Sequence, residues 1–376
     1  MFRYLKKLKK FNKFKFLLPP KKSILILDTP GSDEIASLIE NKDFEILDLR
    51  NELNLPVLIL SIFSFKRKTI TQKYIESYIG IVNPKILVTF IDNNISFFEI
   101  KLKDANFKKI IVQNGTGIIN SLDSIDPNKK YDVDYAFVFS KNYSDFYKKI
   151  IKGKIVVHGS LRNNFISIRE NKNPKNDILF ISQFRDKNIF NHTKYSWDKW
   201  HKAEIETIKL LNKFCFEKNK KLTIAGFYQK EMKSEKHFYE EIFSKETNVC
   251  QYNFLPRENK NQTYKLMDDS KLIVTIDSAI GYEALVRENK LLFFHLRSYF
   301  LENPTLKFGW PKSYAKEGEF WVDYFNTDII NEKINFMLNL SKNDWKKIKN
   351  RYIPELMYYD QNNLKLKKLL SNYQNV

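Results

Sequence analysis

A chain of 376 residues, 43% of them hydrophobic, is long enough to form two domains with apolar cores. Its formal net charge of +20 favours anionic partners, namely nucleotide sugars, acidic glycans, anionic lipid surfaces or nucleic acid. Two cysteines argue against a disulfide framework, the five histidines lack metal-ligand spacing, and no apolar run has the roughly 18 residues that a membrane span needs. We therefore expect a cytoplasmic protein.

Residues 1–22 are a basic amphipathic segment with nine basic residues and no acidic one. Phe2, Leu5, Leu8 and Phe11 recur at near-helical spacing between lysines. Such a segment can lie in a membrane interface, with aromatic rings at the acyl boundary and lysines on lipid phosphates. Two roles are possible for this segment. It can contact the inner face of the plasma membrane, or it can be a basic arm that is solvated or packed on the protein.

Residues 23–170 are predicted to form a first Rossmann-like domain. Short apolar runs alternate with helical patterns, and the predicted strands are 23–28, 44–47, 56–63, 84–90, 110–112, 134–139 and 154–157. This alternation is typical of a doubly wound α/β sheet.

Three of these strands are followed by polar clusters, namely Asp92-Asn93-Asn94, Gln113-Asn114-Gly115 and His158-Gly159-Ser160. The carboxyl ends of parallel strands share one rim of the sheet, where ligands bind. We expect Asp92 to be the base or the attacking carboxylate, and His158 to assist proton transfer. Turns formed locally by Asp and Asn are the alternative for these clusters.

The residues expected to bind the acceptor or sugar on this rim share hydrogen-bonding side chains or a close-approach backbone. They are Asn93, Asn94, Asn114, Gly115 and Arg162. Arg162 is included because a guanidinium group binds phosphate or carboxylate in a fork, and a surface ion pair is its alternative role.

A polar, proline-bearing link at 170–176 predicts a domain boundary, and residues 176–340 are predicted to form a second Rossmann-like domain that binds the nucleotide sugar. Within it, 271–295 is typical of a strand, a short polar turn, a helix and a second strand. Asp277 and Ser278 are expected to cap the helix, and Glu283 to bind ribose hydroxyls. An ordinary, capped βαβ unit is the alternative.

The full predicted donor-binding set lies at the strand ends of this domain: Ser182, Gln183, Arg185, Gly226, Ser278, Gly281, Tyr282 and Glu283. Asp277 joins Asp92 and His158 as a catalytic candidate. Two similar domains whose strand ends face a central cleft would be the GT-B architecture of many nucleotide-sugar glycosyltransferases.

Eight short sequence motifs occur in a characteristic order: FIDNN (90–94), VQNG (112–115), FVFS (137–140), HGSLRNN (158–164), LFISQFR (179–185), DSAIGYEAL (277–285), FGWP (308–311) and GEFW (318–321). Over residues 80–325 the chain resembles bacterial surface-carbohydrate biosynthesis proteins of GT-B architecture. That group includes transferases of capsule and lipopolysaccharide assembly, among them retaining β-Kdo transferases that use CMP-Kdo.

The resemblance implies a glycosyltransferase that moves a sugar, favoured as Kdo from CMP-Kdo, onto a glycan or glycolipid. It also implies a nucleophilic aspartate, for which Asp92, Asp186 and Asp277 are candidates, whereas Gln183 stands directly after the first strand of the second domain. In this architecture the C-terminal segment, 341–376, often crosses back as a helix to the first domain; an independent solvated helix is the alternative.

Several other functions compete with this one. A UDP-N-acetylglucosamine 2-epimerase-type enzyme or a UDP-hexose or UDP-hexosamine transferase would use the same fold. A non-catalytic binding module would bind nucleotide without turnover. Nucleic-acid binding is suggested only by charge, because no nucleic-acid-binding motif occurs. No DxD motif precedes a matching site, so we expect neither a metal nor another cofactor.

Overall fold

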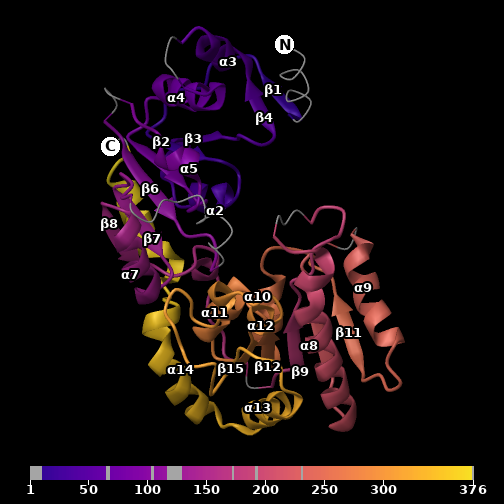
Figure 1. Ribbon diagram of the computed structural model, residues 1–376. Coiled ribbons are helices and arrows are strands. Elements are labelled where there is room, and N and C mark those ends of the chain that lie inside the picture. Colours follow the sequence, from indigo (N-terminus) through magenta and orange to yellow (C-terminus); the bar gives the residue numbers. More distant parts are fainter. Residues whose placement is uncertain are drawn as a thin grey trace. The chain divides into compact units, whose positions relative to one another are not determined.

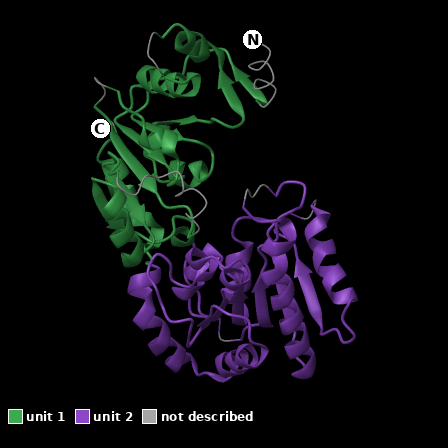
Figure 2. Ribbon diagram, viewed as in Figure 1, with its two compact units in different colours: residues 1–165, 358–376 green, residues 166–357 purple. Residues whose placement is uncertain are grey.

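The computed structural model describes residues 11–64, 68–102, 106–116, 129–171, 173–190, 194–229 and 232–374. The chain divides into two compact units (Figure 2), one made of residues 1–165 and 358–376 and the other of residues 166–357. Each unit contains its own parallel α/β sheet (Figure 1), which confirms the predicted fold class. Among the described helices, none combines the length and the apolar character that crossing a membrane requires.

Unit 1 is built on a six-stranded, fully parallel sheet with the order β3-β2-β5-β6-β7-β8. Its strands are β2 (Ile24–Leu27), β3 (Phe44–Leu47), β5 (Ile86–Thr89), β6 (Lys108–Val112), β7 (Tyr135–Val138) and β8 (Lys154–Val157). Most central strand residues are Ile, Leu or Val and are fully buried, as expected for a sheet with both faces covered.

The helices of unit 1 are α2 (Ser32–Ala36), α3 (Leu55–Ile62), α4 (Ile70–Val82), α5 (Ile95–Phe98), α7 (Lys141–Ile150) and α15 (Leu364–Ser371). Leu366 and Leu370 of α15 belong to the same apolar core as Ile24, Ile86 and Ile110 of the sheet. A separate two-stranded parallel sheet joins β1 (Lys13–Lys15) to β4 (Glu52–Asn54).

The predicted strand at 56–63 is wrong, because this segment is helix α3. The Asn54 side chain caps the helix by accepting from the Val57 amide at 3.1 Å. Pro56 lies in the first helical turn, where its missing N–H costs nothing. Only Val57 and Ser61, one turn apart, are buried.

Unit 2 contains a seven-stranded sheet with the order β11-β10-β9-β12-β13-β15-β14, in which only β14 runs antiparallel to its neighbour. Its strands are β9 (Asn176–Ile181), β10 (Leu222–Ala225), β11 (Tyr252–Leu255), β12 (Ser270–Thr275), β13 (Lys290–Phe294), β14 (Glu317–Gly318) and β15 (Trp321–Val322). The strand order reverses between β9 and β12, so the carboxyl ends of these two strands mark the topological switch point of the sheet.

The helices of unit 2 are α8 (Trp197–Glu217), α9 (Lys233–Ser244), α10 (Gln262–Asp268), α11 (Ala279–Leu285), α12 (Leu296–Phe300), α13 (Thr327–Asn339) and α14 (Lys342–Leu356). The division between the units falls at 165/166 and again at 357/358, inside the segment 341–376. That segment is therefore two helices, with α14 in unit 2 and α15 in unit 1.

Candidate functional site

In unit 1, Asp92 lies just beyond β5 and is almost completely buried. Its carboxylate accepts a hydrogen bond from the Tyr147 hydroxyl and a longer one, at 3.4 Å, from the Asn114 backbone N–H. Burial raises the pKa of Asp92 to about 6, although both hydrogen bonds oppose the rise. A carboxyl that titrates near neutral pH can accept a proton from a hydroxyl group, which is the chemistry expected of this residue.

The loop after β6 is fixed beside Asp92 by Gln113. Its amide oxygen accepts from the Phe139 backbone N–H at 2.8 Å, and its amide nitrogen donates to the Gly115 carbonyl at 3.0 Å. The Asn114 side chain stays exposed. The structure thus brings Asp92, Asn114 and Gly115 to one rim, as the sequence predicted for parallel strand ends.

Other acceptor candidates have local partners. Asn94 caps α5 by accepting from the Phe97 amide at 3.3 Å. Arg162 is 3.3 Å from Glu34 and lies over the Phe90 ring, with 41% of its side chain exposed. The surface ion pair considered for Arg162 is therefore present, and no contact described for Asn93 or Asn94 tests their binding role.

His158 is removed from the catalytic set. Its ring is fully buried against Phe137, and burial lowers its pKa to about 4, so the imidazole is neutral at physiological pH. Its backbone carbonyl accepts from the Asn164 amide at 3.0 Å, and its Nε2 lies 3.7 Å from Asp360. The Asp360 contact joins His158 to the C-terminal segment, so the surroundings of His158 are those of a structural residue.

In unit 2, Gln183 and Asp277 meet at the switch point. Gln183 follows β9 and Asp277 follows β12, and the two residues exchange hydrogen bonds. The Gln183 side-chain amide donates to Asp277 Oδ1 at 2.7 Å, and the Asp277 backbone N–H donates to Gln183 Oε1 at 3.0 Å. Gln183 therefore holds the Asp277 loop in place at the position where ligands of open α/β sheets bind.

Two arginines lie near this pair. Arg297 of α12 is buried, stacks 4.6 Å over Trp200 and donates from Nη1 to Asp277 Oδ1. Arg185 lies 4.0 Å over Phe227, and its pKa is lowered by burial and by the nearby charge of Arg297. Asp277 Oδ2 and Arg297 Nη2 are buried with no hydrogen-bond partner among the described residues. Buried polar atoms of this kind are rare, and a bound polar ligand or an ordered water would satisfy them.

A buried carboxylate network supports the loops that carry these groups. Glu204 of α8 accepts hydrogen bonds from the Gln183 backbone N–H at 2.9 Å and from the Tyr239 hydroxyl. Glu235 of α9 accepts from the Phe227 amide at 2.8 Å, directly after Gly226. Burial raises the pKa of both glutamates.

Ser182 belongs to this supporting network, since its hydroxyl oxygen lies 2.7 Å from the Tyr239 hydroxyl oxygen and its own proton is donated to Glu235. Our sequence reasoning did not select Glu204, Glu235 or Arg297. One signal was available for Glu204, because it lies on the apolar, buried stripe of α8, where an acidic residue needs partners.

Helix α11 lacks the side-chain cap that we expected. Ser278 occupies the N-cap position but makes no side-chain capping bond. Gly281 faces the sheet, since a Cβ there would lie 2.5 Å from Thr275 Cγ2 and 2.7 Å from Phe293 Cε1. Tyr282 is buried, and its hydroxyl accepts from the Gly309 amide at 2.9 Å. Gly281 and Tyr282 therefore serve packing and are removed from the donor set.

Glu283 of α11 is also buried, and it accepts from the Tyr264 hydroxyl at 2.6 Å. The ribose role predicted for Glu283 stays untested. Among the described residues, no group of three or more His, Cys, Asp and Glu side chains is arranged to hold a metal ion.

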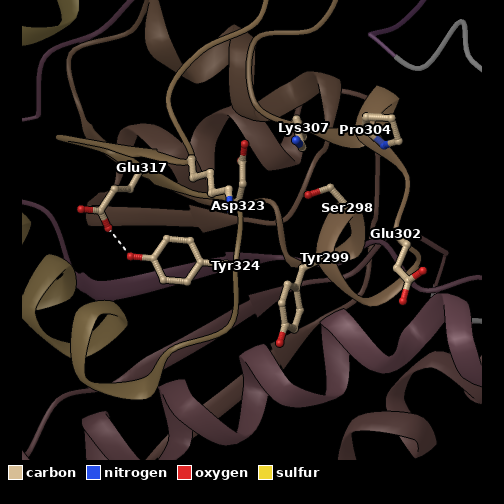
Figure 3. A pocket seen from close by; sticks show the side chains of 9 residues that line it. Ser298, Tyr299, Glu302, Pro304, Lys307, Glu317, Asp323 and Tyr324 are labelled. Atoms are coloured by element: carbon tan, nitrogen blue, oxygen red, sulfur yellow. Dashed lines mark hydrogen bonds between the residues drawn. The ribbon is translucent and has the colours of Figure 1, made fainter.

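A pocket of about 710 Å³ opens beside α12 and β15 (Figure 3). Its lining includes two tyrosines, two lysines and three acidic residues: Tyr299, Tyr324, Lys307, Lys316, Glu302, Glu317 and Asp323. Tyr299 is 50% exposed, and Tyr324 donates its hydroxyl proton to Glu317. Burial raises the pKa of Asp323. Aromatic faces and hydrogen-bonding charges in one concave pocket suit a hydroxyl-rich ligand such as a saccharide.

The pocket and the switch-point cluster share α12. Arg297 of this five-residue helix contacts Asp277, while its neighbours Ser298 and Tyr299 line the pocket. The two places are therefore neighbouring parts of one region of unit 2.

Structural comparison shows the fold of the whole chain. The wall teichoic acid polymerase TagF (H548A) matches with a TM-score of 0.53 and 11% identity, covering 94% of this chain and 89% of that chain. The UDP-GlcNAc 2-epimerase of Methanocaldococcus jannaschii, solved with UDP-GlcNAc and UDP, matches with a TM-score of 0.52 and 12% identity, covering 96% and 99%. At such identities the similarity establishes the GT-B fold class of two Rossmann-like domains.

Comparison with curated protein sequences finds no significant match. A family described as "putative O-antigen biosynthesis protein" matches residues 110–374, which is more than half of the chain. The match begins in β6 and runs through the whole of unit 2 into the C-terminal helix α15. The chain therefore belongs to this family of O-antigen biosynthesis proteins.

Proposed function

We propose that this protein is a glycosyltransferase of surface-polysaccharide synthesis that moves a sugar from a nucleotide donor to a glycan or glycolipid acceptor. The observation that carries the proposal is the Gln183–Asp277 pair at the switch point, with Arg297 bound to it and Arg185 nearby. Guanidinium groups bind phosphate oxygens in a fork, and a desolvated site strengthens that attraction. Membership in an O-antigen biosynthesis family supports the same class of reaction.

Unit 2 would bind the donor in this proposal. Arg185 and Arg297 would hold the phosphate and stabilise the negative charge that develops on it as the glycosidic bond breaks. Asp277 is already engaged by Gln183 and Arg297, so we assign it to positioning of these groups and no longer to proton transfer. The transfer is proposed to need no metal, because the arginines supply the compensating charge.

Unit 1 would supply the base. Asp92 has a raised pKa and a single strong hydroxyl donor, Tyr147, so its carboxylate can accept the proton of an acceptor hydroxyl near neutral pH. Whether the sugar configuration is inverted or retained depends on whether Asp92 acts as a base or attacks the sugar carbon itself.

The pocket beside α12 is the proposed place for a sugar unit. Tyr299 offers an exposed ring for the C–H face of a pyranose, and the surrounding lysines and carboxylates can bond its hydroxyls. Three acidic residues against two lysines disfavour a nucleotide phosphate there, so this pocket and the arginine pair would bind different parts of the substrates.

The donor is proposed to be CMP-linked, with Kdo as the favoured sugar, on the basis of the sequence motifs. A UDP-linked hexose or hexosamine is the main alternative. The structural similarity to a UDP-GlcNAc 2-epimerase also keeps an epimerase in consideration as a second activity class.

A thermal-shift panel of CMP, UDP, GDP and their sugars tests the proposal directly, since a ligand that binds the folded state raises its melting temperature. We expect one nucleotide class to stabilise the wild type and to lose its effect in Arg185→Met. Arg351→Met is the matched control, because Arg351 is an exposed arginine of α14 that pairs with Glu319. A panel without any shift, or equal shifts in both variants, would contradict the donor site.

Product analysis then separates the two enzyme classes. Incubation with the stabilising donor alone should leave the sugar configuration unchanged, and transfer should require a glycan or glycolipid acceptor. Formation of an epimeric sugar nucleotide without acceptor would assign the epimerase activity instead.

The membrane contact predicted for residues 1–22 also stays a proposal. Residues 1–10 lie outside the described part of the chain, and residues 11–22 include β1. Work at the inner face of the plasma membrane would suit an enzyme with a lipid-linked acceptor.

A further inference from the structure

Eight large apolar side chains are exposed on one small part of unit 1. They are Phe14 (42%), Phe16 (73%), Leu17 (81%), Leu18 (52%), Ile59 (55%), Leu60 (51%), Ile62 (59%) and Phe63 (73%). The other nine exposed large apolar residues of the described chain are spread from Ile189 to Leu364. Scattered exposed apolar residues are normal, whereas a concentration of this kind marks an interaction surface.

The two stretches lie side by side. Strand β1 pairs with β4, and α3 begins directly after β4, as the adjacent labels in Figure 1 show. The Asn54 side chain, which caps α3, also donates to the Leu17 carbonyl at 2.7 Å. This bond ties the exposed residues after β1 to the start of the exposed helix. We call these eight residues the β1–α3 face.

Helix α3 shows why this face is unusual. Val57 and Ser61 make a narrow buried stripe, while Ile59, Leu60, Ile62 and Phe63 point away from the unit. A surface helix of a soluble protein normally presents polar residues on its outer side. The sequence of α3, LPVLILSI, contains no charged residue at all.

The sequence that flanks the face is rich in basic residues. Residues 1–22 carry nine basic residues and no acidic one, and Lys66-Arg67-Lys68 follows α3 closely in the sequence. The nearby acidic residue Glu52 is only 11% exposed and is neutralised by Lys13 and Lys15. Lys15 also pairs with Glu45, and Lys68 pairs with Glu76. Residues 11–22, which the structure describes, contain four lysines and no acidic residue, so the sequence beside the exposed apolar side chains carries an excess of positive charge.

We infer that the β1–α3 face docks onto an anionic lipid bilayer. Its apolar side chains enter the boundary between headgroups and acyl chains, and the flanking lysines and arginine bind lipid phosphates. A second copy of the chain fits less well, because two such faces would bring like charges together. The inference is independent of the donor site and adds α3, which the sequence patterns had suggested to be a strand of the sheet.

Vesicle flotation tests the inference with the full-length chain. We expect the protein to float with phosphatidylcholine vesicles that contain phosphatidylglycerol, and to float much less with phosphatidylcholine alone. The double variant Leu17→Ser/Phe63→Ser removes two of the most exposed side chains, and its partition should fall at least about tenfold. Both positions are at least 73% exposed, so folding should be preserved.

The matched control is Ile189→Ser/Phe336→Ser, which replaces side chains that are 58% and 46% exposed on unit 2 and should float like the wild type. Equal flotation of both double variants, or no flotation of the wild type, would overturn the inference. So would a wild-type dimer in light scattering that Leu17→Ser/Phe63→Ser converts to a monomer, since that identifies a second copy as the occupant. Nucleotide shifts recorded on the same samples test the proposed function separately, because the lipid result does not depend on them.

Discussion

Asp92 makes a quantitative prediction about stability. Its pKa is raised from an ordinary 3.8 to about 6 because the carboxyl is buried. The folded state therefore keeps this proton up to about pH 6, whereas the unfolded chain releases it near pH 4. Because the unfolded state binds fewer protons in this window, the free energy of unfolding falls as pH rises through it. Holding Asp92 ionised at pH 8 costs the folded state about 3 kcal/mol.

Asp92→Asn removes this cost, because the amide stays neutral and its oxygen can still accept from Tyr147. The variant should gain stability relative to the wild type, and the gain should rise by about 1 to 2 kcal/mol between pH 5 and pH 8. Other titrating groups, such as His158, are present in both proteins and cancel in the difference. Turnover should fall at least about 100-fold if Asp92 is the base.

Hydrogen exchange of peptides from β5 and β6 measures this difference within unit 1. All five tryptophans lie in unit 2, so tryptophan fluorescence follows that unit separately and should show no change. A stability gain that does not vary with pH would mean that Asp92 ionises at an ordinary pKa. The argument for a base at this position would then fail.

Three further variants test unit 2. Gly281→Ala should cost about 1–3 kcal/mol in urea unfolding, because its Cβ would meet the Phe293 ring, and an unchanged midpoint would refute the packing role. Arg297→Met should lower the free energy of unfolding by about 3–5 kcal/mol, because Asp277 is left buried without its cation. Adding Asp277→Asn should recover part of this loss. A double variant no more stable than the single one would contradict the ion pair. Tyr299→Ala should raise the acceptor KM while nucleotide thermal shifts persist, and unchanged acceptor kinetics would exclude the pocket as a sugar site.

Local patterns in the sequence identified the strand-end residues correctly as neighbours. Asp92 and Asn114 meet because parallel strands bring their carboxyl ends to one rim, and Gln183 and Asp277 meet for the same reason. Alternating apolar runs and helices were sufficient to predict that architecture. The side chains directly after the strands could therefore be placed without any knowledge of distant contacts.

Residues whose roles depend on distant partners could not be assigned in this way. Histidine is a residue type common in catalysis, but His158 is buried beside Asn164 and contacts Asp360 of the C-terminal segment. Gly281 had been read as a point of ligand approach, whereas the ring of Phe293 occupies that side. In each case the deciding contact comes from another element, and periodicity carries no information about it.

Helix α3 shows a different limit of sequence patterns. A short apolar run is compatible with a buried strand or with a helix, and periodicity alone does not separate them. Pro56 and the Asn54 cap select the helix, yet even this assignment would not have predicted exposure, because an apolar helix is normally buried. The side chains of Ile59 and Phe63 are exposed because no other apolar element in the described part of the chain packs over them. An apolar helix that the described part of the chain leaves uncovered is explained most simply by a surface outside the protein, and the excess of basic residues in the flanking sequence favours an anionic one.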